Sequence, residues 1–157
     1  MTVRLYQDDP TLRETTATVL ASGPDGIVLD RTVFYARAGG QPGDVGNLHE
    51  PNGAAITITD TIKHPDGSDR VLHIVAPDTS LPAPGTSVVA ALDWPRRAAV
   101  MRMHSALHLL CAAIPGAAVT GGQIGTDRAR LDLDLPTAPD RDALTAALMA
   151  MVAADHP

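Results

Sequence analysis

Cysteine is almost absent from this sequence. The one cysteine among 157 residues, Cys111, excludes a disulfide framework. No run of apolar residues is long enough to span a bilayer. The N-terminal stretch MTVRLYQDDP has neither the charge nor the apolar block of a signal peptide. From these absences we expect a soluble cytoplasmic protein.

Aromatic residues and positive charge are also scarce. Phe, Trp and Tyr make up 3% of the chain, so the core must be built from Ala, Val, Leu, Ile and Met. The net charge is −6 and the pI is about 5.3, which argues against binding nucleic acid through overall charge. A local basic patch is still open at Arg96, Arg97 and Arg102. The 45% hydrophobic content predicts a folded globular protein.

Residues 2–92 have the pattern of a β-rich unit. Turn sequences at 23–26 and 65–68 contain Pro-Asp-Gly, and each lies between two stretches rich in β-forming residues. Short strands with polar turns are typical of a small antiparallel barrel or sandwich. The predicted strands, six in all, are 2–7, 14–22, 26–35, 55–64, 70–76 and 85–93.

The pattern changes at Asp93, which predicts a second domain over 93–157. Asp93 is a good N-cap with Pro95 in the first turn, and the helix should end near Ala113, before Pro115-Gly116. Two strands, 117–125 and 128–136, and a final helix capped by Asp140 should follow. The expected fold class is therefore α+β, with a barrel in 1–92 and an α, β, β, α unit after it.

The predicted helix MRMHSALHLLCAA is apolar nearly all round, so we expect it to be central and covered. His104 and His108 are four residues apart and share one side, where both ring nitrogens can reach one metal ion. Two core histidines that bond to backbone carbonyls are the alternative. Cys111, one turn further along, is either a third ligand or a small hydrophobic residue, and its apolar surroundings argue against a nucleophilic role.

The segment DRTVFYARAGGQPGDVG, residues 30–46, is the second distinctive feature. Gly39 and Gly40 allow positive φ and close approach of the backbone to a ligand. Gln41 precedes Pro42, which favours an extended conformation, and its amide can both donate and accept hydrogen bonds. A tight turn between barrel strands is the alternative interpretation.

Together these segments resemble the alanyl-tRNA editing proteins, free-standing relatives of the editing domain of alanyl-tRNA synthetase. TVFYARAGGQPGDVG is similar to that family's Thr-x-Phe-Tyr…Gly-Gly-Gln-Pro-Gly-Asp-x-Gly motif. DWPRRAAVMRMHSALHLLCAA is similar to its helix with Met-Arg-x-His-(Thr/Ser)-Ala-x-His-Leu-Leu. The resemblance implies a small barrel followed by an α/β editing domain shared with threonyl-tRNA synthetase. It also implies hydrolysis of the ester in tRNA(Ala) mischarged with serine or glycine.

The resemblance also implies roles for particular residues. One Zn²⁺ would be bound by His104 and His108 together with a later Cys-x-x-x-His. Thr32 matches a threonine linked to recognition of the seryl hydroxyl, and Gln41 and the Gly39-Gly40 pair match the motif that faces the substrate pocket. We therefore predict catalytic roles for Gln41 and Thr32. Arg97, on the histidine side of the helix, is predicted to meet the terminal tRNA phosphates, with a surface salt bridge as the alternative.

The sequence departs from the family's pattern in one respect. It contains no Cys-x-x-x-His, because its only cysteine lies inside the predicted helix. We expect these residues to be the N-terminal part of a longer editing protein whose second sheet is incomplete here. His156 is an alternative ligand beside the terminal proline. A non-catalytic module that binds tRNA or a synthetase, and a purely structural barrel, are the other hypotheses.

Overall fold

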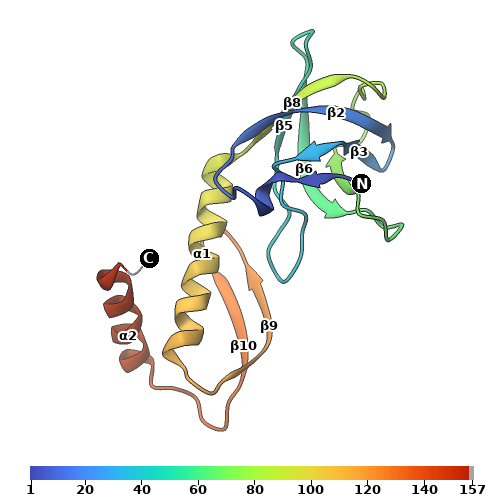
Figure 1. Cartoon of the computed structure of the whole chain (residues 1–157). Helices are drawn as coiled ribbons and strands as arrows, with labels where there is room; N and C mark the ends of the chain where they lie inside the picture. The colour runs from blue at the N-terminus through green and yellow to red at the C-terminus, as the bar shows by residue number, and fades with distance from the viewer. Residues whose placement is uncertain (156–157) are drawn as a thin grey trace. The chain divides into compact units, whose positions relative to one another are not determined.

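The computed structural model describes residues 1–155, which form two compact units (Figure 1). The first contains Met1–Ala38 and Pro42–Arg97. The second contains Gly39–Gln41 and the residues from Ala98 onward. The observed boundary lies after Arg97, inside the long helix and five residues after the predicted boundary at residue 92. The tip of the Gly-Gly-Gln-Pro segment belongs to the second unit.

A closed antiparallel barrel forms the first unit. The strand order is β2-β3-β7-β6-β5-β8, and β8 pairs back onto β2 to close the barrel. Closure leaves no unpaired strand edge in the barrel itself. The six strands are β2 (Glu14–Gly23), β3 (Gly26–Leu29), β5 (Gly46–His49), β6 (Ala55–Lys63), β7 (Val71–Val75) and β8 (Ser87–Leu92).

Alternation of apolar and polar residues places the barrel's core. Ala17 and Val19 in β2, and Ile56 and Ile58 in β6, point inward while their neighbours are exposed. These side chains pack with Phe34 and with aliphatic residues of the other strands. With only one Phe in the chain, the core is filled mainly by Val, Leu, Ile and Ala, as the composition predicted.

Two predicted strands of the first unit differ from the structure. The first predicted strand is limited to β1 (Val3–Arg4), which runs into a 3-10 helix at Leu5–Gln7 and pairs with β4 (Arg31–Thr32) outside the barrel. The predicted strand 26–35 is interrupted at Asp30, whose carboxylate accepts a hydrogen bond from the Thr18 backbone. The sixth barrel strand is instead β5, which was not predicted.

The second unit has the predicted order of elements. It comprises most of α1 (Trp94–Ala113), then β9 (Ala118–Ile124), β10 (Ala129–Asp134) and α2 (Arg141–Ala154). The two strands form an antiparallel hairpin. Asp93 accepts a hydrogen bond from the Arg96 backbone at 3.1 Å, and Asp140 accepts one from the Ala143 backbone at 2.8 Å. Both predicted N-caps are therefore confirmed.

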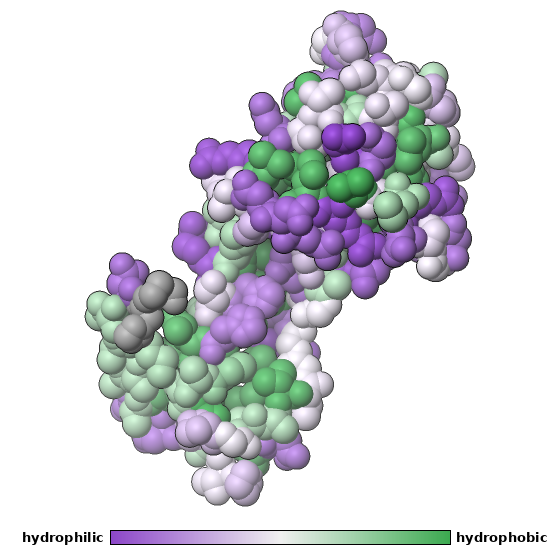
Figure 2. Space-filling model, viewed as in Figure 1, coloured by the Kyte–Doolittle hydropathy of each residue, from purple (hydrophilic) through white to green (hydrophobic). Residues whose placement is uncertain are grey.

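The helices of this unit are less covered than their composition predicted. We expected α1 to be central, but most of its apolar side chains, Leu107 and Leu110 among them, are only half-buried. In α2 no residue is buried, and Met149 and Val152 are 63% and 59% exposed. Figure 2 shows the corresponding hydrophobic surface over α2. The prediction failed because the sheet beside these helices has only two strands among residues 1–155. Within these residues, no helix combines the length and the apolar character needed to cross a membrane.

Candidate functional site

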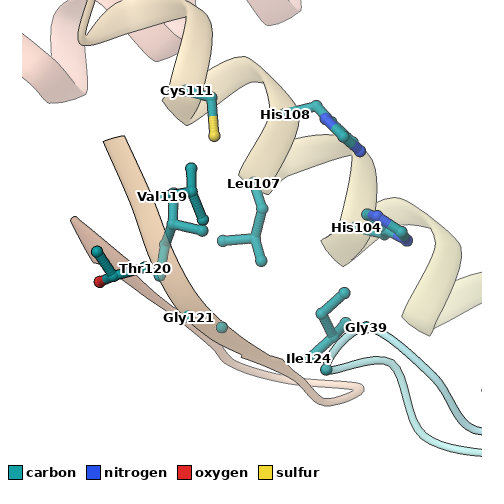
Figure 3. A pocket seen from close by; sticks show the side chains of 12 residues that line it. Gly39, His104, Leu107, His108, Cys111, Val119, Thr120, Gly121 and Ile124 are labelled. Carbon is teal, nitrogen blue, oxygen red and sulfur yellow. The ribbon is translucent and has the colours of Figure 1, made fainter. Parts of the chain in front are cut away.

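The two helix histidines lie side by side on α1. Their ring centroids are 4.9 Å apart and the ring planes differ by 15°, so the imidazoles are stacked. Figure 3 shows both rings on the same side of the helix. His104 is half-buried and His108 is exposed, so the expectation of two buried imidazoles is wrong. The spacing nevertheless gives the adjacent pair that the sequence predicted.

Gln41 is in direct contact with this pair. Its side-chain Oε1 lies 2.7 Å from Nδ1 of His104, and the residue is only 6% exposed. Desolvation, and secondly the charge of His108, lower the pKa of His104 below its ordinary value. The ring is therefore neutral at physiological pH, which is the form that ligates metals or accepts a proton.

The glycines before Gln41 bring the backbone against β9. Gly39 and Gly40 have φ of +58° and +79°, which confirms the predicted positive φ values. The carbonyl oxygen of Gly40 accepts a hydrogen bond from the Ile124 backbone at 2.9 Å. A Cβ on Gly40 would lie 2.4 Å from the carbonyl oxygen of Gly122, so this position requires glycine.

A cavity of about 540 Å³ lies beside these residues within the second unit (Figure 3). The histidine pair and the Gly39-Gly40 turn provide its polar lining, and Leu107, Val119 and Leu131 are among the apolar residues. Its complete lining is Gly39, Gly40, His104, Leu107, His108, Cys111, Val119, Thr120, Gly121, Gly122, Ile124 and Leu131. Such a cavity suits a ligand whose surface is mostly apolar and that carries a small polar group.

The sequence interpretation missed the contribution of β9 to this cavity. The run Thr120-Gly121-Gly122 was assigned only to a strand. Two consecutive glycines inside a strand are a usable signal, because they often mark close approach of another backbone or a ligand. Here the backbone that approaches is the Gly40 turn.

Residues 1–155 do not contain a complete cluster of metal-binding side chains. Across residues 1–155, no three His, Cys, Asp or Glu side chains are grouped closely enough to hold an ion. Cys111 lines the cavity but does not join the histidines in such a group, so the alternative in which it is a third ligand is not supported. His156 lies outside the described residues. The donor set present is therefore two imidazoles, half of what a structural zinc ion takes.

Thr32 lies in the first unit and is fully buried. Its hydroxyl oxygen is 2.8 Å from Nε2 of His73 and accepts a hydrogen bond from the Phe34 backbone at 3.0 Å. Nδ1 of His73 lies 3.0 Å from the carbonyl oxygen of Ile27 and donates to it, so Nε2 accepts the Thr32 proton. Burial lowers the pKa of His73 to about 4, which keeps this ring neutral. The predicted recognition role of Thr32 stays a prediction.

Arg97 is also buried, at 4% exposure. The predicted phosphate contact and its alternative, a surface salt bridge, both require an exposed side chain. The Arg97 guanidinium forms an ion pair with Asp44, whose side chain is equally buried. The Asp44 carboxylate also accepts a hydrogen bond from the Tyr35 backbone at 2.7 Å. No role for Asp44 was predicted from the sequence. The signal for this ion pair in the sequence was an acidic residue among several glycines, in the compact segment AGGQPGDVG.

Similar proteins are found among the tRNA synthetases and the alanyl-tRNA editing proteins. A family model described as tRNA synthetases class II (A) matches residues 7–96, more than half of the chain. Alanyl-tRNA editing protein AlaX-M of Methanosarcina mazei is 39% identical over 145 residues, covering 86% of this chain and 56% of that protein. The protein of the same name from Saccharolobus solfataricus is 32% identical over 138 residues, covering 86% and 57%.

A long enzyme contains a similar segment. Alanine–tRNA ligase of Pyrobaculum arsenaticum is 38% identical over 147 residues, which cover 87% of this chain and 16% of the ligase. The chain thus spans a little over half the length of the editing proteins that it matches. By the family model and by the resemblance of its two motifs, the chain belongs to the class II (A) tRNA synthetase family, with the alanyl-tRNA editing proteins among its relatives.

Proposed function

We propose that this protein is a zinc-dependent deacylase that hydrolyses the ester bond of tRNA(Ala) mischarged with serine, and also with glycine. The contact of Gln41 with the stacked His104–His108 pair beside a cavity carries the proposal. The names of the relatives, which are editing proteins for alanyl-tRNA, support the substrate class. A cytoplasmic site of action follows from that substrate.

The residues beside the cavity suit an aminoacyl ester. His104 and His108 would supply two nitrogen donors to zinc, and no third donor is grouped with them among residues 1–155. When bound, zinc polarises an ester carbonyl or provides a hydroxide near neutral pH. In this proposal the Gly39-Gly40 turn would bring backbone close to the substrate, and Leu107, Ile124 and Leu131 would form the apolar wall of the cavity.

Release of serine from Ser-tRNA(Ala) tests this proposal. We expect deacylation with added Zn²⁺ and loss of at least 100-fold in rate for the double variant His104→Ala/His108→Ala, measured by release of radiolabelled serine. His49→Ala, an exposed barrel histidine, is the matched control and should leave the rate unchanged. Gly-tRNA(Ala) and Ala-tRNA(Ala) measured in parallel define the preference. Full activity in the double variant contradicts the proposal.

A second function is favoured by the incomplete donor set. A module that binds tRNA(Ala) or its synthetase without hydrolysis needs no metal, and no third ligand lies near the histidines among residues 1–155. Binding of tRNA(Ala) at physiological salt, with no turnover at any zinc concentration, would support this function over the first. The net charge of −6 argues that such binding depends on specific contacts.

A further inference from the structure

The contact between Gln41 and His104 determines which nitrogen of the imidazole carries the proton. The atom of Gln41 that faces the ring is the amide oxygen Oε1, which only accepts hydrogen bonds. At 2.7 Å from Nδ1, it requires a proton on that nitrogen. A neutral imidazole has one N–H, so Nε2 of His104 then holds a free lone pair.

We propose that Gln41 is a positioning residue for His104, holding the proton on Nδ1 so that Nε2 is the donor atom available to a divalent cation. The first half concerns the protein alone, and the second half rests on the proposed zinc function. An imidazole without such a partner distributes its proton over both nitrogens, and one of these forms has no lone pair at Nε2. Acceptors on the second nitrogen of metal-binding histidines fix both tautomer and ring orientation in this way.

The surrounding structure holds the Gln41 amide in place. The preceding residue is fixed by its backbone hydrogen bond to Ile124 at 2.9 Å and by close contact with Gly122. The following residue, Pro42, restricts the backbone of Gln41. Because the backbone of Gln41 is restrained on both sides, its hydrogen bond to His104 requires ordering of the side chain alone and no further loss of backbone entropy. The 6% exposure of Gln41 agrees with a side chain held against His104 and disagrees with one that is free in solvent before substrate binds.

The test uses metal-free protein of all 157 residues at pH 8. Long-range ¹H–¹⁵N NMR distinguishes the two tautomers, and the spectrum of His104→Ala assigns the signals. We expect His104 to carry its proton on Nδ1 in the natural protein. Gln41→Met, which keeps length but removes the acceptor, should shift a measurable fraction to Nε2–H. Gln41→Glu, which restores an acceptor, should return the proton to Nδ1. Gln123→Met, at an exposed glutamine on β9, is the matched control.

Zinc affinity provides the second readout, measured by competition with a chromophoric chelator. Gln41→Met should weaken Zn²⁺ binding by about 10–100-fold, while Gln41→Glu and Gln123→Met should not weaken it. A wild-type His104 protonated on Nε2, or a tautomer unchanged in Gln41→Met with an otherwise native spectrum, overturns the inference. If no variant binds zinc but the tautomer shifts as described, the positioning role stands and the zinc-dependent function fails.

Discussion

Replacing Arg97 with Met should destabilise the barrel strongly, because it leaves a buried carboxylate without its counter-charge. The side chains of Asp44 and Arg97 are 3% and 5% exposed. After the substitution the carboxylate would keep its hydrogen bond from the Tyr35 backbone but lose the guanidinium. Breaking a buried ion pair in this way costs about 3–5 kcal/mol in the free energy of unfolding.

The cost should also depend on pH. Burial raises the pKa of Asp44 above its ordinary value, although the Tyr35 backbone and Arg97 oppose the shift. A raised pKa in the folded state means that protonation of Asp44 favours folding at low pH, and this contribution is lost as pH rises through the folded pKa. Without Arg97 that pKa rises further, so the carboxyl protonates more readily. The destabilisation should be smaller at pH 5 than at pH 8.

Urea unfolding followed by fluorescence of Trp94, the only tryptophan, measures both effects in the first unit. The double variant Asp44→Asn/Arg97→Met should lose less than the sum of the two single variants, since neither charge is left alone. Arg37→Met is the control, because Arg37 pairs with Asp60 at the surface and should contribute less than about 1 kcal/mol. A cost for Arg97→Met that matches this control, or that is equal at both pH values, would refute the reasoning.

Three further predictions concern buried contacts. Burial lowers the pKa of His73 from 6.5 to about 4, so the stability that the neutral ring provides is fully present above pH 6.5, and about 3 kcal/mol of it is lost as pH falls towards 4. In urea titrations at several pH values, His73→Gln should reduce this dependence of the unfolding free energy on pH. An unchanged dependence would argue against the role of His73. Thr32→Val should cost about 1–3 kcal/mol by leaving its two buried partners unsatisfied, and unchanged stability in urea would contradict this. In thermal melts followed by circular dichroism, Gly40→Ala should destabilise more than Gly39→Ala, because only the Gly40 Cβ meets the carbonyl of Gly122; equal melting temperatures would contradict this.

Local chemistry made much of the fold predictable. The bounds of α1 follow from the Asp93 cap and from the Pro115-Gly116 stop, and the observed helix is Trp94–Ala113. The hairpin of β9 and β10 follows from two β-rich runs separated by a turn. The adjacency of His104 and His108 is a property of helical spacing alone, so the sequence was sufficient to place both rings together.

Long-range contacts account for what the sequence did not reveal. Nothing near Gln41 in sequence indicates that its amide meets His104, 63 positions away. The strand β5 has only four residues, and it follows a Gly-rich segment, so its pairing with β6 and β8 rather than its own composition makes it a strand. The burial of Arg97 likewise depends on Asp44, 53 positions away, and not on the helix that carries it.

The assignment of Gly39–Gln41 to the second unit also limits how this protein can be recombined. The second unit is discontinuous in the chain, since three of its residues precede Pro42 and the rest follow Arg97. A single crossover near residue 97 between two diverged relatives would keep both histidines but exchange the glutamine that contacts one of them. The Gly-Gly-Gln turn and the histidine helix should therefore be transplanted as a matched pair, which requires two additional junctions, at each side of the turn.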